Sequence, residues 1–171
     1  MPKADDALSM LKHDHEQVKK LFKKIEAEED QETTFNQIKV ALELHATIEE
    51  EIFYPAVKKA RSEEVKDEVR EAYEEHKQVK ALLAAIAEIL PTEESYSAKI
   101  KVLKDDVDHH IREEEGEMFA DARKYLRAAK LEQLGSQMQA RKDELQAITE
   151  AEPGASGERK TTSRTEKSKE S

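Results

Sequence analysis

The same arrangement of residues occurs twice in this chain. The segment Asp14–Leu21 matches Glu75–Leu82 at an offset of 61 residues. Farther along each half, His45 is followed by a glutamate four positions later, and His110 repeats this pair at an offset of 65 residues. A duplicated unit of this kind predicts two similar hairpins related by an approximate twofold axis. Equivalent residues of the two hairpins would then meet in one shared core.

Apolar residues recur at intervals of three and four in five segments, which predicts amphipathic helices. These helices are expected at about residues 5–29, 34–60, 62–90, 95–127 and 131–149. Pro55 lies inside the second segment and is expected to kink it or to end its regular part. Four long helices with short connections predict an all-α fold, an antiparallel up-down-up-down four-helix bundle with an extra C-terminal helix.

The chain divides into three regions on this interpretation. Residues 1–128 would form the bundle, and residues 129–150 the C-terminal helix. The apolar stripe of that helix is thin, so the helix could pack along the bundle or mediate a homodimer contact. Residues 151–171 are rich in Ser, Thr, Lys and Glu and are expected to be a disordered tail, because they offer too little apolar surface to offset the entropy of ordering.

Composition excludes several classes of function. The net charge is −10, and an acidic surface repels phosphate, so neither nucleic acid nor an anionic membrane is expected as a partner. The chain has no Cys, which rules out disulfides and thiolate metal sites. We find no signal-peptide pattern and no apolar run of membrane-spanning length, so we expect a cytoplasmic protein.

Six metal-ligating side chains fall on the inward apolar stripes of the predicted helices. They are His15, His45, Glu49, His76, His110 and Glu114. Residues four positions apart lie on one helix face, so both side chains of a His-x-x-x-Glu pair can bind the same cation. A buried carboxylate is costly unless it is paired or bound to a metal. A single inward His is usually a core residue, but the repeated order of all six predicts a metal site.

The types of ligand narrow the choice of metal. Imidazole and carboxylate without sulfur fit iron well. Six protein ligands are too many for one tetrahedral zinc ion and suit two ions roughly 3.5–4 Å apart. Glu49 and Glu114 would then bridge the two ions, and the four His would be terminal ligands.

The remaining candidates lie off these stripes. His13 and His109 are expected at the surface or rim, with His109 as the alternative ligand. Glu50 and Glu115 are expected to be mostly solvated charges that could also support a ligand by hydrogen bonding.

These motifs resemble those of the haemerythrin-like family, the HHE cation-binding domains. The matching groups are Asp14-His15, His45 through Glu49-Glu50 to Phe53-Tyr54-Pro55, Glu75-His76, and His110 through Glu114-Glu115 to Met118-Phe119, all within about residues 7–126. The resemblance implies an antiparallel four-helix bundle around two non-haem iron ions joined by an oxo or hydroxo bridge. Oxygen-carrying members have a second His one turn before the His of the third helix, where this chain has Ala72. We therefore expect a more open metal, completed by water or an exogenous ligand.

Three functions follow from this resemblance. The first is a di-iron protein that binds oxygen or a related small ligand, such as peroxide or nitric oxide, for sensing, storage or protection. The second is a di-iron oxidoreductase that removes peroxide or nitric oxide. The third is a structural or interaction bundle in which the metal is vestigial. The sequence does not decide whether the protein is an enzyme.

Overall fold

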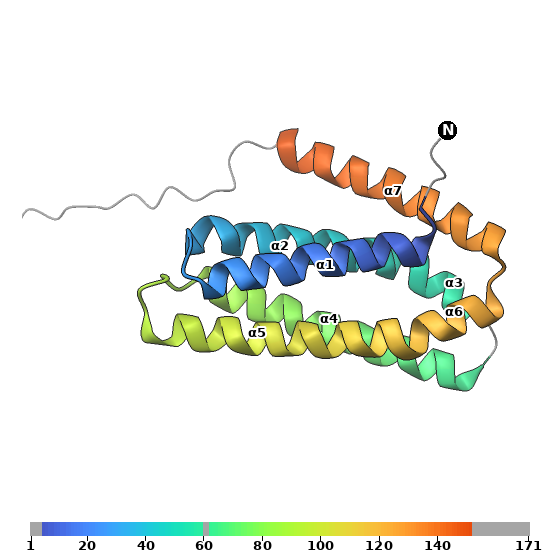
Figure 1. The fold of residues 1–171 in the computed structure, drawn as a ribbon, viewed down its shortest axis with the longest axis horizontal. Coiled ribbons are helices and arrows are strands. Elements are labelled where there is room, and N and C mark those ends of the chain that lie inside the picture. Colours follow the sequence, from blue (N-terminus) through green and yellow to red (C-terminus); the bar gives the residue numbers. More distant parts are fainter. Residues whose placement is uncertain (1–4, 60–61, 152–171) are drawn as a thin grey trace, which may run out of the picture.

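The computed structural model describes residues 5–59 and 62–151, and this part of the chain is built from helices. Four long helices form an antiparallel bundle (Figure 1). They are α1 (Ala7–Glu26), α2 (Gln31–Ile48), α4 (Glu63–Ala87) and α5 (Glu94–Glu113). The bundle with its additional C-terminal helix confirms the predicted fold class. The predicted bounds differ from the observed ones by one to three residues, since the first and third segments are predicted too long, while the C-terminal helix is longer than predicted.

Each His-x-x-x-Glu pair is followed by a turn of π-helix. The π-helix η1 (Glu49–Phe53) leads into α3 (Tyr54–Lys58), and η2 (Glu114–Met118) leads into α6 (Phe119–Tyr125). In η1 the Tyr54 N–H bonds to the Glu49 carbonyl, five residues back. The regular helix therefore changes before Pro55, which sits in the first turn of α3. Because η2 has the same form without a proline, Pro55 is not the sole cause of the π turn.

The polar residues of the core lie between two apolar clusters. One cluster includes Leu11 and Ile48, and the other includes Val18 and Leu42. His15 follows Leu11 by one turn and precedes Val18, while His45 lies between Leu42 and Ile48. The apolar clusters hold the four helices at fixed spacing above and below this polar layer, so the ligand-bearing segments have little freedom to move.

The C-terminal helix α7 (Ala128–Ala151) packs along the face formed by α1 and α2 (Figure 1). Its Gly135 lies so close to the chain that a Cβ there would be 2.3 Å from the Asp5 carbonyl oxygen. Of the two roles expected for this helix, the structure therefore shows packing along the bundle, and the homodimer contact stays a prediction. The expected tail, residues 152–171, lies outside the described residues. Within residues 5–59 and 62–151, no helix is long and apolar enough to cross a membrane.

Candidate metal centre

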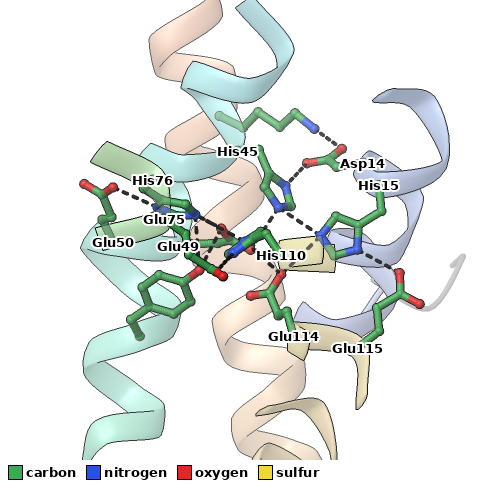
Figure 2. A network of polar contacts seen from close by, with 12 residues as sticks. Asp14, His15, His45, Glu49, Glu50, Glu75, His76, His110, Glu114 and Glu115 are labelled. Atoms are coloured by element: carbon green, nitrogen blue, oxygen red, sulfur yellow. Dashed lines mark hydrogen bonds and ion pairs between the residues drawn. The ribbon is translucent and has the colours of Figure 1, made fainter. Parts of the chain in front are cut away.

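The structure brings all six predicted ligand residues together in the bundle core (Figure 2). Their side chains are buried. Each of the four long helices contributes one His, and the two glutamates begin the two π-helices: His15 (α1), His45 (α2), His76 (α4), His110 (α5), Glu49 (η1) and Glu114 (η2). The ligand-type atoms thus come from both halves of the duplicated chain.

The six residues form two groups of donor atoms that share Glu49. One group is His15, His45, Glu49 and Glu114, and the other is Glu49, His76 and His110. Glu49 Oε1 lies 2.9 Å from His45 Nε2, and its Oε2 lies 3.2 Å from His76 Nε2. The two oxygens of this one carboxylate therefore face different groups, as a bridging ligand requires.

Glu114 lies nearer to one group than to the other. Its Oε2 is 3.1 Å from His15 Nε2 and 3.8 Å from His110 Nε2. Because Oε2 faces an imidazole from each group, a small rotation of the carboxylate would let Glu114 bridge as Glu49 does.

The Nδ1 atom of each imidazole contacts a carboxylate from another helical segment. We call the four residues that provide these carboxylates the supporting carboxylates. The Nδ1 contacts run from His45 to Asp14 (3.4 Å), His76 to Glu50 (2.8 Å), His110 to Glu75 (2.7 Å) and His15 to Glu115 (2.8 Å). In a neutral imidazole, donation from Nδ1–H to the carboxylate fixes the tautomer and leaves a lone pair on Nε2 for a cation. Such carboxylate support orients a metal-ligating imidazole and raises its basicity.

The free Nε2 atoms converge in pairs. His15 and His45 bring theirs to 3.1 Å, and His76 and His110 bring theirs to 3.3 Å. Two nitrogens that bind one cation at right angles, each at about 2.1 Å, lie about 3 Å apart. Two lone pairs at this distance repel each other unless a proton or a cation lies between them, so the spacing fits one cation at each pair.

The buried glutamates supply a second test of fit. Oε1 of Glu49 and both oxygens of Glu114 accept no hydrogen bond of good geometry from the described residues. An uncompensated buried oxygen costs free energy, and a charged one costs more. Four converging imidazole nitrogens and three unsatisfied oxygens make a donor set that fits two closely spaced cations.

Tyr54 is a further residue of this centre that the sequence reasoning did not place there. Its hydroxyl is 3.2 Å from Glu49 Oε2, to which it donates, and 3.3 Å from His76 Nε2. Burial raises its pKa well above the ordinary value, and the charges of Glu114 and Glu49 raise it further. The hydroxyl is therefore a neutral donor unless a cation binds its oxygen, and Tyr54 is a seventh residue with a ligand-type atom, on the His76 side.

The charges in the centre are set by burial and by pairing. Burial by itself would raise the pKa of Glu49, but the nearby charges of His45 and His76 hold it well below its usual range. Burial raises the pKa of Glu114, and the negative charge of Glu49 adds to the effect. Burial would lower the pKa of His45, yet Glu49 and Asp14 together raise it to about 10. Without a bound cation, Glu49 and His45 are thus an ion pair beside a second carboxyl group, that of Glu114, whose pKa is raised.

A comparison with known families agrees with this geometry. Residues 6–122 match the hemerythrin HHE cation-binding domain. The chain belongs to this family. The His and Glu residues of the expected HHE motifs lie on the four long helices and the two π-helices described above.

Relatives of this HHE domain come from cyanobacteria and mycobacteria. A Nostoc sp. (strain PCC 7120) protein named DNA nickase is 31% identical over 140 residues, which cover 80% of this chain but only 39% of the relative. The uncharacterized protein Rv2633c of Mycobacterium tuberculosis is 28% identical over 145 residues, or 82% of this chain and 87% of that protein. A crystal structure of its homologue from Mycobacterium kansasii, an HHE cation-binding domain-containing protein, has a TM-score of 0.75 at 26% identity and covers 86% of this chain and 91% of its own.

The structure also places the residues outside the six. His13 and His109 are exposed, as expected, and His109 lies beside Glu75 and Glu113 rather than in the centre. Glu50 and Glu115 are supporting carboxylates, which the sequence reasoning had allowed as a secondary role. The same role of Asp14 and Glu75 was missed, although the repeated acid before each first His of a hairpin was a signal for it.

The pH dependence of stability in the metal-free HHE domain should reflect His45. A raised pKa in the folded state stabilises the fold fully below the ordinary value of 6.5, and this contribution is lost as pH rises towards about 10. We therefore expect the melting temperature of chelator-treated protein to fall between pH 7 and pH 10. Thermal melts across this range test it, and the fall should be smaller in His45→Gln. An equal fall in both proteins would contradict the assignment.

Helix α7 is connected to the centre by an ion pair of one lysine side chain. Lys142 Nζ pairs with Asp14 Oδ1 at 2.5 Å, and Asp14 in turn supports His45. Burial alone would raise the pKa of Asp14, but His45 and Lys142 together lower it below its usual value. The contact keeps Asp14 ionised and oriented, so that α7 indirectly positions the candidate metal ligand His45.

Replacing Lys142 by methionine should weaken metal binding without removing a ligand. Loss of a partner of this kind typically costs about 10-fold to 100-fold in metal affinity. We expect a decrease near the lower end, because Asp14 keeps its contact with His45. Competition with a chelator measures the affinity, and Lys130→Met on the exposed face of α7 is the matched control. Equal affinities of the two variants would show that α7 has no influence on the centre.

Proposed function

We propose that this HHE domain holds two non-haem iron ions and that the pair binds dioxygen or a related small ligand. The observation that carries the proposal is the set of two donor groups that share Glu49. Imidazole with carboxylate and no sulfur suits iron. Six residues with a shared carboxylate suit two ions rather than one. Bound iron would supply the electrons exchanged with the small ligand.

A small apolar cavity beside the imidazoles supports the choice of ligand. It has a volume of about 30 Å³ and is bordered by the four His and mostly by apolar side chains, such as Val18 and Leu42, with Glu43 and Lys80 also in its lining. One water needs about 10–15 Å³ of such volume and two or more polar partners. This cavity is therefore large enough for a diatomic molecule and poorly suited to charged substrates. It favours dioxygen or nitric oxide as the ligand.

Tyr54 supports a second candidate function, an oxidoreductase that removes peroxide or nitric oxide. Its buried hydroxyl donates to Glu49, at the edge of the donor set. Reduction of a small oxygen-containing ligand consumes protons, and a hydroxyl in this position can deliver one. The net charge of −10 favours small ligands over nucleic acid for both candidates.

Anaerobic titration with ferrous iron, followed by admission of oxygen, tests the proposal. We expect two tightly held irons per chain and new near-ultraviolet and visible absorption after oxygen is admitted. Absorption that disappears when oxygen is withdrawn would support carriage or sensing. Peroxide or nitric oxide consumption that exceeds that of free iron, and decreases in Tyr54→Phe, would support the oxidoreductase. If the protein binds no iron, the di-iron proposal is wrong and a structural bundle becomes the better interpretation.

A further inference from the structure

A second pocket reaches the centre from the side of α4, α5 and η2. Its volume is about 60 Å³, and six glutamates contribute to its lining: Glu68, Glu71, Glu75, Glu113, Glu114 and Glu117. This pocket is distinct from the apolar cavity near Leu42, since the two share only His110 among their lining residues. The centre is therefore approached by one apolar route and one strongly acidic route.

The inner wall of the acidic pocket belongs to the centre itself. Glu114 and His110 both line the pocket. The Glu114 side chain is only 1% exposed, and neither of its oxygens accepts a hydrogen bond of good geometry from the described residues, although Oε2 lies 3.1 Å from His15 Nε2. A buried carboxylate whose hydrogen bonds are not satisfied, at the end of an acidic pocket, is stabilised by a cation.

Three residues that could bind a metal ion lie beside this pocket, at the protein surface. Donor atoms of Glu75, His109 and Glu113 lie within 4.8 Å of one another. His109 Nε2 is 3.1 Å from Glu113 Oε1 and 3.6 Å from Glu75 Oε1. The other oxygen of Glu75 accepts from His110 Nδ1 at 2.7 Å. Glu75 thus connects the surface group directly to a residue of the centre.

The pocket also lacks compensating positive charge. Among residues 5–59 and 62–151, no Lys or Arg forms an ion pair with Glu68, Glu71 or Glu117. Oε2 of Glu68 is buried without a hydrogen-bond partner. Burial raises the pKa of Glu68, and the negative charges of Asp121 and Glu117 raise it further. A cation in the pocket would relieve this repulsion.

Ala72 explains why the pocket exists at this place. It lines the pocket one helical turn before His76, and its single methyl group leaves the space that a larger side chain would fill. A pocket lined by one sign of charge concentrates ions of the opposite sign and speeds their arrival. The apolar cavity cannot concentrate a hydrated cation in this way, because its lining carries no comparable negative charge.

We propose that the acidic pocket beside Ala72 is the entry site through which a divalent cation reaches the centre. Glu75, His109 and Glu113 hold the cation first, and Glu114 and His110 receive it. The inference rests on the proposed metal-binding function and adds a route to it. Small ligands and cations then approach the centre by separate routes.

The rate of ferrous iron uptake without air tests this proposal. Free iron is followed with a chromogenic ferrous chelator after rapid mixing with apoprotein. The test variant is the triple substitution Glu68→Gln, Glu71→Gln and Glu117→Gln, which removes three charges that contact no residue of the donor set. The matched control is Glu32→Gln, Glu88→Gln and Glu94→Gln, which removes three exposed charges remote from the pocket. A second test variant, His109→Gln, alters one exposed residue of the surface group.

We expect the triple test variant to take up iron about 10-fold more slowly than wild type at low ionic strength. The difference should shrink in concentrated salt, because salt screens exposed charges. The final iron content should stay at two per chain, and His109→Gln should also slow uptake. Wild-type rates in both test variants, or equal slowing in the control, would overturn the entry site and leave the proposed function intact. If wild type itself takes up no iron, the proposed function fails and the entry site fails with it.

Discussion

The substitution Glu49→Gln is expected to reduce the metal content from two ions per chain to one at most. Glutamine keeps the shape of the side chain but has one ligand oxygen and no charge, so it cannot serve both donor groups. The affinity for any remaining ion should fall more than about 100-fold, the upper end of what loss of a supporting group costs. Elemental analysis after passage over a chelating resin measures the content.

Glu114→Gln is the matched comparison for this substitution. Burial and the charge of Glu49 raise the pKa of Glu114, so its charged form is less well stabilised in the core than that of Glu49, and a neutral glutamine costs less there. Glu114→Gln should therefore lower metal content yet leave the stability of the apoprotein almost unchanged. Glu49→Gln should also destabilise the apoprotein, by about 3 kcal/mol, the low end for a broken buried pair, because His45 loses one carboxylate partner and keeps the other, Asp14.

Thermal melts of the two apoproteins separate these effects. Equal stability of both apoproteins would contradict the assignment of Glu49 as the ionised carboxylate. Two tightly held metal ions in Glu49→Gln would exclude this residue as the shared ligand of the two groups.

Loading with ferrous iron is expected to raise the melting temperature of the wild-type protein by about 10 °C. A ligand that binds only the folded state at about 1,000 times its dissociation constant stabilises by about 4 kcal/mol. In a domain of this size, each kcal/mol raises the melting temperature by about 2–4 °C. The physical reason is that the cations compensate the converging imidazole nitrogens and the buried oxygens of Glu49 and Glu114.

Differential scanning calorimetry with and without iron, under nitrogen, measures this increase. A chelator should reverse it. The double variant Glu49→Gln with Glu114→Gln should melt at the same temperature with and without iron. A similar increase in wild type and double variant would mean that iron binds elsewhere, for example at the exposed group around His109.

Much of the centre could be predicted because its ligands follow local rules. His45 and Glu49 lie four positions apart, and this spacing places them on one face of a helix whatever the rest of the chain does. The apolar neighbours of His15 and His76 mark these residues as inward for the same reason. The duplication then indicates that the two halves meet, which explains why six residues far apart in sequence could be named together.

Other parts of the centre depend on contacts between helices. Asp14 precedes His15 but supports His45, and Glu75 precedes His76 but supports His110. Sequence spacing cannot show this exchange, because it depends on the rotation and offset of neighbouring helices. Tyr54 reaches the donor set only because η1 adds a residue to the turn between Glu49 and the tyrosine.

The sequence by itself determined the helices, their inward faces and the candidate ligand residues, since periodicity and short spacings are properties of a single helix. The tertiary structure alone decided which carboxylate supports which imidazole and how Lys142 on α7 reaches Asp14, 128 residues away. It also decided where the two pockets beside the centre lie. These features arise where side chains of separate helices meet, and their positions follow from packing rather than from order along the chain.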